Sequence, residues 1–192
     1  MKKVGVLSLQ GDFAAHGAAL ERAGAVPVFV REREQLGQID GLILPGGEST
    51  TMLKLLHYED LFEDVAEFGR TKPVFGTCAG AILMAKDVTS PAQESFGLVD
   101  IEIERNAYGR QIDSRIAQVQ PFPDFENRTA PGELKAVFIR APIIRRIEDG
   151  VRVLASYQGD PVLVEQGPFL VATFHPELTD DARVHSLFLS KL

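Results

Sequence analysis

The chain of 192 residues has a net charge of −7 and a pI near 5.1, and 45% of its residues are hydrophobic. Binding to nucleic acid needs a basic face, so this acidic balance argues against a nucleic-acid partner. No apolar stretch approaches the roughly 20 residues that span a bilayer, which predicts no membrane association. The early apolar run stops at Gln10 without a cleavage-like site, so we expect a cytoplasmic protein.

The length and the hydrophobic content predict one domain over residues 1–192. In the first half, short apolar runs alternate with helical patterns, which is typical of a parallel sheet with helices on both faces. Strands are expected at residues 4–9, 26–30, 42–44 and 73–75. Helices are expected at residues 13–23, 49–56, 61–68 and 79–84.

The second half is richer in strand-like segments. Strands are expected at residues 98–103, 136–139, 151–155, 162–164 and 170–174. Residues 121–132 hold three prolines and several polar residues, which favours a surface loop. A final helix is expected to begin at Asp180 or Asp181.

The single cysteine, Cys78, lies between an apolar strand and a helix, in the segment Gly76-Thr77-Cys78-Ala79-Gly80. This G-x-nucleophile-x-G arrangement is typical of a sharp strand-to-helix elbow. Backbone amides and the dipole at the start of the helix favour the thiolate, which is the attacking form. A lone cysteine is often a buried structural residue, but this context predicts a nucleophile.

The segment His175-Pro176-Glu177 follows an apolar run, at the end of a strand where functional groups of α/β sheets collect. Residues two apart in an extended segment point to the same side, and Pro176 is expected to keep the pair extended. His175 can then accept the Cys78 proton and later protonate the leaving amine, while Glu177 stabilises the imidazolium. A His near a Glu is usually a surface pair, but the elbow cysteine favours a catalytic triad.

A glycine-containing loop, Pro-Gly-Gly-Glu-Ser-Thr at residues 45–50, follows the third strand. Amides of Gly46 and Gly47 could face outward and form an oxyanion hole. A phosphate loop is disfavoured because G-x-x-x-x-G-K-[ST] is absent and Glu48 would repel phosphate. A plain turn without a binding role is the remaining alternative for residues 45–50.

The other histidines, His16, His57 and His185, show no metal-ligand spacing with one another or with Cys78. We therefore expect no metal site and interpret these three as surface or helix-packing residues. Most arginines are solvated, but one near the cleft would suit a substrate carboxylate. The candidates in the β-rich half are Arg105, Arg110, Arg140, Arg145 and Arg146.

Over nearly its whole length the sequence resembles the class I, triad-type glutamine amidotransferases, and more specifically the glutaminase subunits of pyridoxal 5'-phosphate synthase. The G-x-C-x-G and His-Pro-Glu segments resemble the wider class. Glu-Ser-Thr-Thr, Ile-Arg-Ala-Pro and Pro-Glu-Leu-Thr resemble this family in particular. The similar segments are residues 5–11, 42–51, 75–80, 104–106, 138–142 and 174–179. Ile82 is a departure, because many class I members carry Gln at that position.

The resemblance implies a flavodoxin-like three-layer α/β sandwich, with a mixed, mostly parallel central sheet flanked by helices. It implies that Cys78 attacks the carboxamide of L-glutamine and forms a γ-glutamyl thioester, which water hydrolyses with the help of His175 and Glu177. The ammonia would pass to a separate (β/α)₈-barrel synthase that makes pyridoxal 5'-phosphate. The implied complex has twelve glutaminase subunits around a synthase dodecamer. No cofactor is expected.

The resemblance also implies a set of glutamine-binding residues and one residue at the partner face. Those that help bind glutamine are Gly46, Gly47, Glu48, Arg105, Ile139 and Arg140. Gln10 would lie at the face that meets the synthase, where docking completes the oxyanion hole.

Two other functions are compatible with these residues. The same triad could feed ammonia to another acceptor, such as the imidazole glycerol phosphate branch. Alternatively, an elbow cysteine on a flavodoxin-like scaffold could sense oxidants instead of cleaving amides. The His-Pro-Glu segment disfavours a sensor, because a sensor does not need a general base with an orienting carboxylate.

Overall fold

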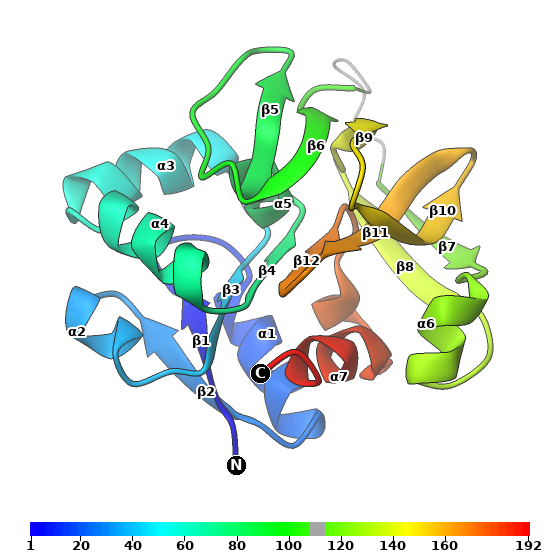
Figure 1. The fold of residues 1–192 in the computed structure, drawn as a ribbon, viewed down its shortest axis with the longest axis horizontal. Helices are drawn as coiled ribbons and strands as arrows, with labels where there is room; N and C mark the ends of the chain where they lie inside the picture. Colours follow the sequence, from blue (N-terminus) through cyan, green and yellow to red (C-terminus); the bar gives the residue numbers. More distant parts are fainter. Residues whose placement is uncertain (108–113) are drawn as a thin grey trace.

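A computed structural model describes residues 1–107 and 114–192 of the chain. Its centre is a seven-stranded sheet with the order β10-β11-β12-β4-β3-β1-β2 (Figure 1). Neighbours from β12 through β2 pair in parallel, whereas β11 is antiparallel to both β10 and β12. The strands are β1 (Lys3–Leu7), β2 (Val26–Val30), β3 (Gly41–Leu44), β4 (Val74–Thr77), β10 (Arg152–Tyr157), β11 (Asp160–Gln166) and β12 (Phe169–Ala172).

Two separate apolar cores lie on the two faces of this sheet, because successive side chains of a strand point to opposite faces. In β3, Leu42 and Leu44 pack into one core and Ile43 packs into the other. Helices α3 and α4 cover the first face, and α1 and α7 cover the second (Figure 1). The helices are α1 (Phe13–Arg22), α2 (Arg33–Leu36), α3 (Ser49–Tyr58), α4 (Phe62–Thr71), α5 (Ala79–Met84), α6 (Pro123–Arg128) and α7 (Arg183–Leu189).

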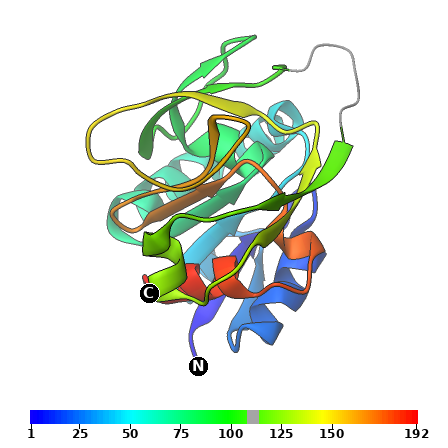
Figure 2. The same cartoon turned by 90° about the vertical axis from the view of Figure 1, so that its right-hand side faces the viewer.

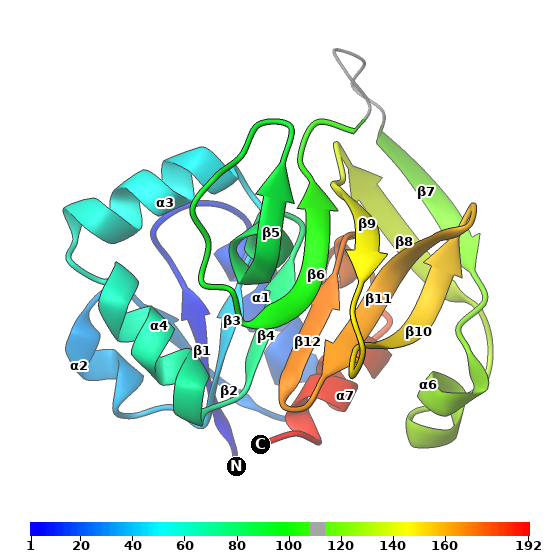
Figure 3. The same cartoon turned by 45° about the horizontal axis from the view of Figure 1, so that its top comes forward.

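Two smaller sheets extend the outer layers. One has the order β5-β6-β9 and packs on the same core as α3, α4 and α5 (Figure 3). The other is the antiparallel pair β7-β8, which packs on the α1 and α7 side and is nearest the viewer in Figure 2. The strands are β5 (Ala85–Thr89), β6 (Val99–Glu104), β7 (Ser114–Val119), β8 (Leu134–Ile139) and β9 (Ile143–Ile147). The sequence patterns did not predict β5, β7 or β9.

The predicted surface loop at residues 121–132 is wrong in part, because it contains α6. Pro123 occupies the first turn of the helix, where its missing N–H costs no hydrogen bond. Phe125 is fully buried and anchors the turn in the core. Arg128 forms a bidentate pair with the buried Glu165, at 2.6 and 3.1 Å. A single apolar anchor in a polar segment leaves no periodic signal in the sequence.

The other boundaries differ by a few residues from the predictions. β1 ends at Leu7 and β12 ends at Ala172, so the last two residues of both predicted strands lie in loops at one edge of the sheet. Helix α7 begins at Arg183. Within the described residues, no helix has both the length and the apolar character required to cross a membrane.

Candidate active site

Cys78 sits at a sharp turn between β4 and α5, as predicted. Its backbone has φ 48° and ψ −103°, a left-handed conformation that is unusual for a residue with a side chain. The Cys78 amide donates to the Ala172 carbonyl at 2.9 Å, which ties the turn to β12. A Cβ atom added to Gly80 would lie 1.9 Å from the Leu44 carbonyl oxygen, so the start of α5 packs directly on β3. The elbow therefore needs a glycine at this position.

His175 lies just beyond β12, and its amide donates to the Val137 carbonyl at 2.8 Å. Its Nδ1 atom is 2.7 Å from Glu177 Oε1. The prediction that the pair is extended is wrong, because Pro176–Leu178 forms a short 3₁₀ turn, η1. Proline suits the first position of such a turn, since its φ is preset and its missing N–H would be unpaired there. The turn folds Glu177 back toward the imidazole.

The buried environment and the neighbouring groups act on His175 in opposite directions. Burial lowers the pKa of His175, but hydrogen bonds with Cys78 and Glu177, together with their charges, raise it to about 10. The exposed fractions of the Cys78 and His175 residues are only 6% and 3%. The imidazolium form of His175 is therefore stabilised between a sulfur and a carboxylate, which is the arrangement of a Cys-His-Glu triad.

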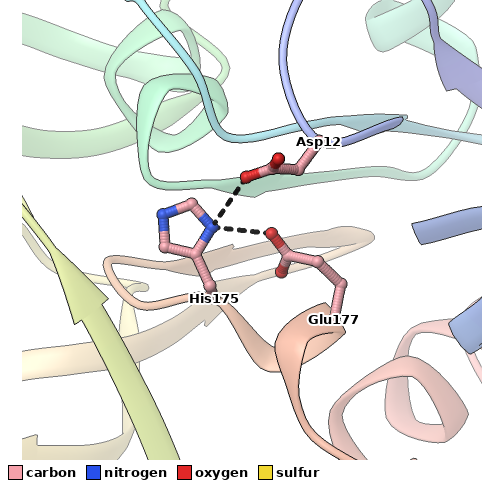
Figure 4. A group of neighbouring side chains, drawn as sticks. All are labelled: Asp12, His175 and Glu177. Carbon is pink, nitrogen blue, oxygen red and sulfur yellow. Dashed lines mark hydrogen bonds and ion pairs between the residues drawn. The ribbon is translucent and has the colours of Figure 1, made fainter. Parts of the chain in front are cut away.

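A second carboxylate approaches the same imidazole nitrogen, as Figure 4 shows. Asp12 Oδ2 is 3.7 Å from His175 Nδ1, but the Asp12 side chain is 47% exposed, whereas that of Glu177 is fully buried. The three side chains are close enough to hold a metal ion. However, a metal on Nδ1 would displace the proton that Glu177 accepts, so we interpret the group as a hydrogen-bonded cluster.

The loop after β3 packs its backbone against the imidazole. A Cβ atom added to Gly46 would lie 2.3 Å from His175 Cε1, so no larger residue fits without moving the ring. Gly11 has φ 93°, and an added Cβ would lie 1.9 Å from the Gly46 carbonyl oxygen. Two glycine-containing loops, one after β1 and one after β3, thus meet over His175.

Gln10 joins these two loops through its side chain. Its Oε1 atom accepts a hydrogen bond from the Glu48 amide at 2.9 Å. Gly47 has φ 154°, and a Cβ atom there would lie 2.5 Å from the same oxygen. The structure therefore places Gln10 beside the predicted oxyanion loop.

Charged residues predicted to bind substrate surround the elbow. Arg140 Nη2 donates to Glu48 Oε1 at 2.6 Å, and the Cys78 thiol is 3.9 Å from the Ile139 carbonyl oxygen. Arg105 Nη2 donates to Thr50 Oγ1 at 2.6 Å. Partial burial lowers the pKa of Arg105, and the nearby Glu48 carboxylate opposes that shift. Both signs of charge are thus available within one site.

Two of the candidate arginines lie elsewhere. Arg145 and Arg146 belong to β9 and pair with surface carboxylates, including Glu104 and Glu102. Arg110 lies outside the described residues. Of the five arginines considered, Arg105 and Arg140 are the two that the described structure links to the elbow and its loops.

The comparisons with known proteins agree with this geometry. Residues 6–192 match the SNO glutamine amidotransferase family. The chain belongs to this family. It is 94% identical to a protein of Solibacter usitatus (strain Ellin6076) named pyridoxal 5'-phosphate synthase subunit PdxT, over 100% of both chains. A protein of the same name from Koribacter versatilis (strain Ellin345) is 56% identical, over 97% of this chain and 94% of its own.

Solved structures confirm the predicted fold class. A crystal structure of a glutamine amidotransferase, 44% identical, has a TM-score of 0.88 and covers 98% of this chain and 97% of its own. The PurLQS structure from Thermotoga maritima has a TM-score of 0.72 at 18% identity, over 99% of both chains, and shows only that the fold is shared. The SNO family member is therefore an α/β glutamine amidotransferase with a mixed, mostly parallel sheet.

The interpretation of His16 and His185 as surface or helix-packing residues is correct only in part. His57 is at the surface, and His16 and His185 do pack from helices α1 and α7. Both of these are fully buried, however, and both belong to a polar network that reaches Glu177. A signal was available, because His16 lies four residues before the buried Leu20, on the stripe that faces the core.

Proposed function

We propose that this SNO family member is the glutaminase subunit of a pyridoxal 5'-phosphate synthase, with Cys78, His175 and Glu177 as its catalytic triad. The observation that carries the triad is the position of His175, whose Nδ1 is 2.7 Å from the buried Glu177 and whose pKa is raised by the neighbouring Cys78 and Glu177. The observation that supports the wider role is the 94% identity, over the full length, to a protein named as a subunit of that synthase.

In the first half of the reaction, the Cys78 thiolate attacks the side-chain carbonyl carbon of L-glutamine. The tetrahedral intermediate collapses, the C–N bond breaks, and His175 gives its proton to the leaving nitrogen, so ammonia departs and a γ-glutamyl thioester remains. The raised pKa of His175 favours this step, because the proton that ammonia needs is already on the imidazole.

In the second half, neutral His175 takes a proton from a water molecule that attacks the thioester carbonyl. The C–S bond breaks, glutamate leaves, and the thiolate and imidazolium are restored. Glu177 stabilises the positive ring at both ends of the cycle and holds the Nδ1 proton, which keeps Nε2 free for transfer. Its full burial strengthens this interaction, because water does not screen it.

The loop after β3 supplies the groups for the oxyanion and for the α-amino group of glutamine. Gly46 lies against His175 and Gly47 lies against Gln10, whose side chain also accepts from the Glu48 amide. The Gly46 and Gly47 amides would donate to the developing oxygen anion. Glu48 would pair with the substrate ammonium. Arg105, Arg140 and the Ile139 backbone would bind its carboxylate end and its stem.

The ammonia would pass to a separate (β/α)₈-barrel synthase, with twelve glutaminase subunits around a synthase dodecamer. The full-length similarity to named synthase subunits supports this partner over an acceptor in the imidazole glycerol phosphate branch. A cytoplasmic location, one domain over residues 1–192, and the absence of nucleic-acid and membrane partners stay predictions. The described His175–Glu177 pair favours the amidotransferase over an oxidant sensor.

The test is glutamate release from L-glutamine, measured with and without the purified barrel synthase, for the wild type and for Cys78→Ala. We expect release by the wild type that rises when the synthase is added, and none by Cys78→Ala in either condition. Release by Cys78→Ala would refute the triad. Wild-type release that the synthase leaves unchanged, with recovery of a different synthase in a pull-down, would refute the partner.

A further inference from the structure

Two histidines that the reaction scheme does not use lie next to the triad carboxylate. His16 Nε2 is 3.0 Å from Thr77 Oγ1 and 3.5 Å from Glu177 Oε2. His16 Nδ1 is 3.0 Å from His185 Nε2. His16, His185 and Thr77 are all completely buried. One imidazole thus connects α1, the end of β4, α7 and the turn that bears the catalytic carboxylate.

Both rings are neutral at ordinary pH. Burial, and then the neighbouring His185 and His175, lower the pKa of His16 well below 6.5. Burial, and then the charge of Arg22, lower the pKa of His185 to about 4. A neutral imidazole has one N–H donor and one bare nitrogen, so each ring presents its donor in one direction only.

The described contacts indicate which nitrogen carries each proton. His185 Nδ1 is buried and has no hydrogen-bond partner within residues 1–107 and 114–192. An unpaired buried N–H is costly, so the His185 proton belongs on Nε2, which donates to His16 Nδ1. The His16 proton is then on Nε2. The opposite tautomer would turn a bare nitrogen lone pair toward an anionic carboxylate oxygen 3.5 Å away.

We infer that His16 is a positioning residue for the triad, which presents its Nε2–H to Glu177 Oε2 and to Thr77 Oγ1. Glu177 uses Oε1 to hold His175, while its Oε2 is buried and makes no hydrogen bond among the described residues. The His16 donor lies within reach of that oxygen and opposes rotation of the carboxylate away from His175. The Thr77 contact links the same ring to the residue that precedes the nucleophile.

The inference rests on the proposed function, because it assigns His16 a task in that reaction. Its effect should be visible in the Cys78 thiolate. If Glu177 loses its orientation, His175 holds its proton less firmly, and the thiolate loses its positive partner at a lower pH. Among the described residues, the titratable and charged groups that act on His175, Glu177 and the two rings include Asp12, Cys78 and Arg22.

The test is the rate at which iodoacetamide alkylates the protein as a function of pH. Cys78 is the single cysteine, so the signal has one source, and neither glutamine nor synthase is required. For His16→Leu we expect alkylation roughly tenfold slower near neutral pH and a midpoint displaced toward alkaline pH, since a buried charged oxygen that loses the only donor facing it among the described residues is destabilised by about this much. A profile identical to that of the wild type would overturn the inference.

Two variants separate positioning from packing. His16→Gln can place an amide donor near the position of Nε2 and should restore most of the alkylation rate. Leu20→Ala removes a fully buried side chain one turn later on α1, and should lower the melting temperature while the alkylation profile keeps its shape. Equal profiles for His16→Leu, His16→Gln and the wild type would leave His16 a packing residue only.

A measurement on the unaltered protein avoids any question of folding. Nitrogen-15 chemical shifts of the imidazoles distinguish the two neutral tautomers, and we expect His16 to be protonated on Nε2. A proton on Nδ1 would leave no donor facing Glu177 and would overturn the inference. A failure of glutamate release, with this tautomer and the alkylation shift both present, would instead count against the proposed function.

Discussion

Two histidine–glutamate pairs in this protein have the same separation and different surroundings. His175 and Glu177 are 2.7 Å apart with side chains 4% and 0% exposed, whereas His57 and Glu94 are 2.7 Å apart with side chains 49% and 53% exposed. The buried pair also neighbours Cys78, and that cysteine and Glu177 raise the pKa of His175 to about 10 against the effect of burial. The exposed pair has water around both partners. Equal contact distances therefore leave the two pairs in different electrostatic surroundings, because water screens the exposed pair and does not screen the buried one.

The largest difference between the two pairs is expected when the same substitution is made at each histidine. His175→Asn removes the proposed proton donor for ammonia and should lower the rate of glutamate release by about 10³-fold, within the range of general acid–base catalysis. His57→Asn is the matched control and should leave the rate within about twofold of the wild type, because surface substitutions have small effects. Comparable losses for the two variants would contradict the assignment of His175.

The next largest difference is expected between substitutions of Glu177 and Glu94, and it concerns the stability of the protein. A histidine whose pKa is raised in the folded state stabilises the fold fully below its ordinary value of 6.5, and this contribution is lost as the pH rises through about 10. Glu177→Gln removes a main source of the raised pKa. We therefore expect its loss of stability to be roughly 3 kcal/mol near pH 6.5, and to shrink as the pH approaches 10.

The control for this experiment is Glu94→Gln. A surface ion pair contributes below about 1 kcal/mol to the free energy of unfolding. The melting temperature of Glu94→Gln should therefore stay close to that of the wild type. Thermal unfolding of the three proteins across the same pH range gives both differences. A Glu177→Gln difference that grows with rising pH would contradict the linkage.

The smallest effect concerns the backbone that covers the buried pair. Gly46→Ala adds a Cβ atom that would lie 2.3 Å from His175 Cε1, so the imidazole ring must move. Because a displaced catalytic group reacts more slowly, we expect roughly a tenfold loss in the rate of glutamate release. Gly37→Ala is the matched control, because its Cβ would meet nothing closer than 3.6 Å. Kinetics with equal activity for both variants would show that the Gly46 contact is not needed.

The local geometry of the candidate site could be predicted where its residues lie in short segments. Gly76 to Gly80 forms the predicted elbow, and His175 with Glu177 lies in one tripeptide, so local spacing already limits their geometry. The shape of that tripeptide could not be predicted from the alternation of a strand. The chain leaves β12 at Ala172, before the histidine, and Pro176 then begins a 3₁₀ turn.

The apolar pattern by itself predicted strands β1 to β4 and every helix of the first half except α2, because a central strand buries both faces and a long helix buries one stripe. Tertiary structure alone decided which residues besides His175 surround Glu177. His16 reaches Thr77 across 61 positions of sequence and His185 across 169. A buried polar side chain takes whichever partner the folded core places beside it. A polar residue in an apolar stripe of the sequence indicates that its side chain needs a buried hydrogen-bond partner. The identity of that partner depends on how the layers pack in the folded protein.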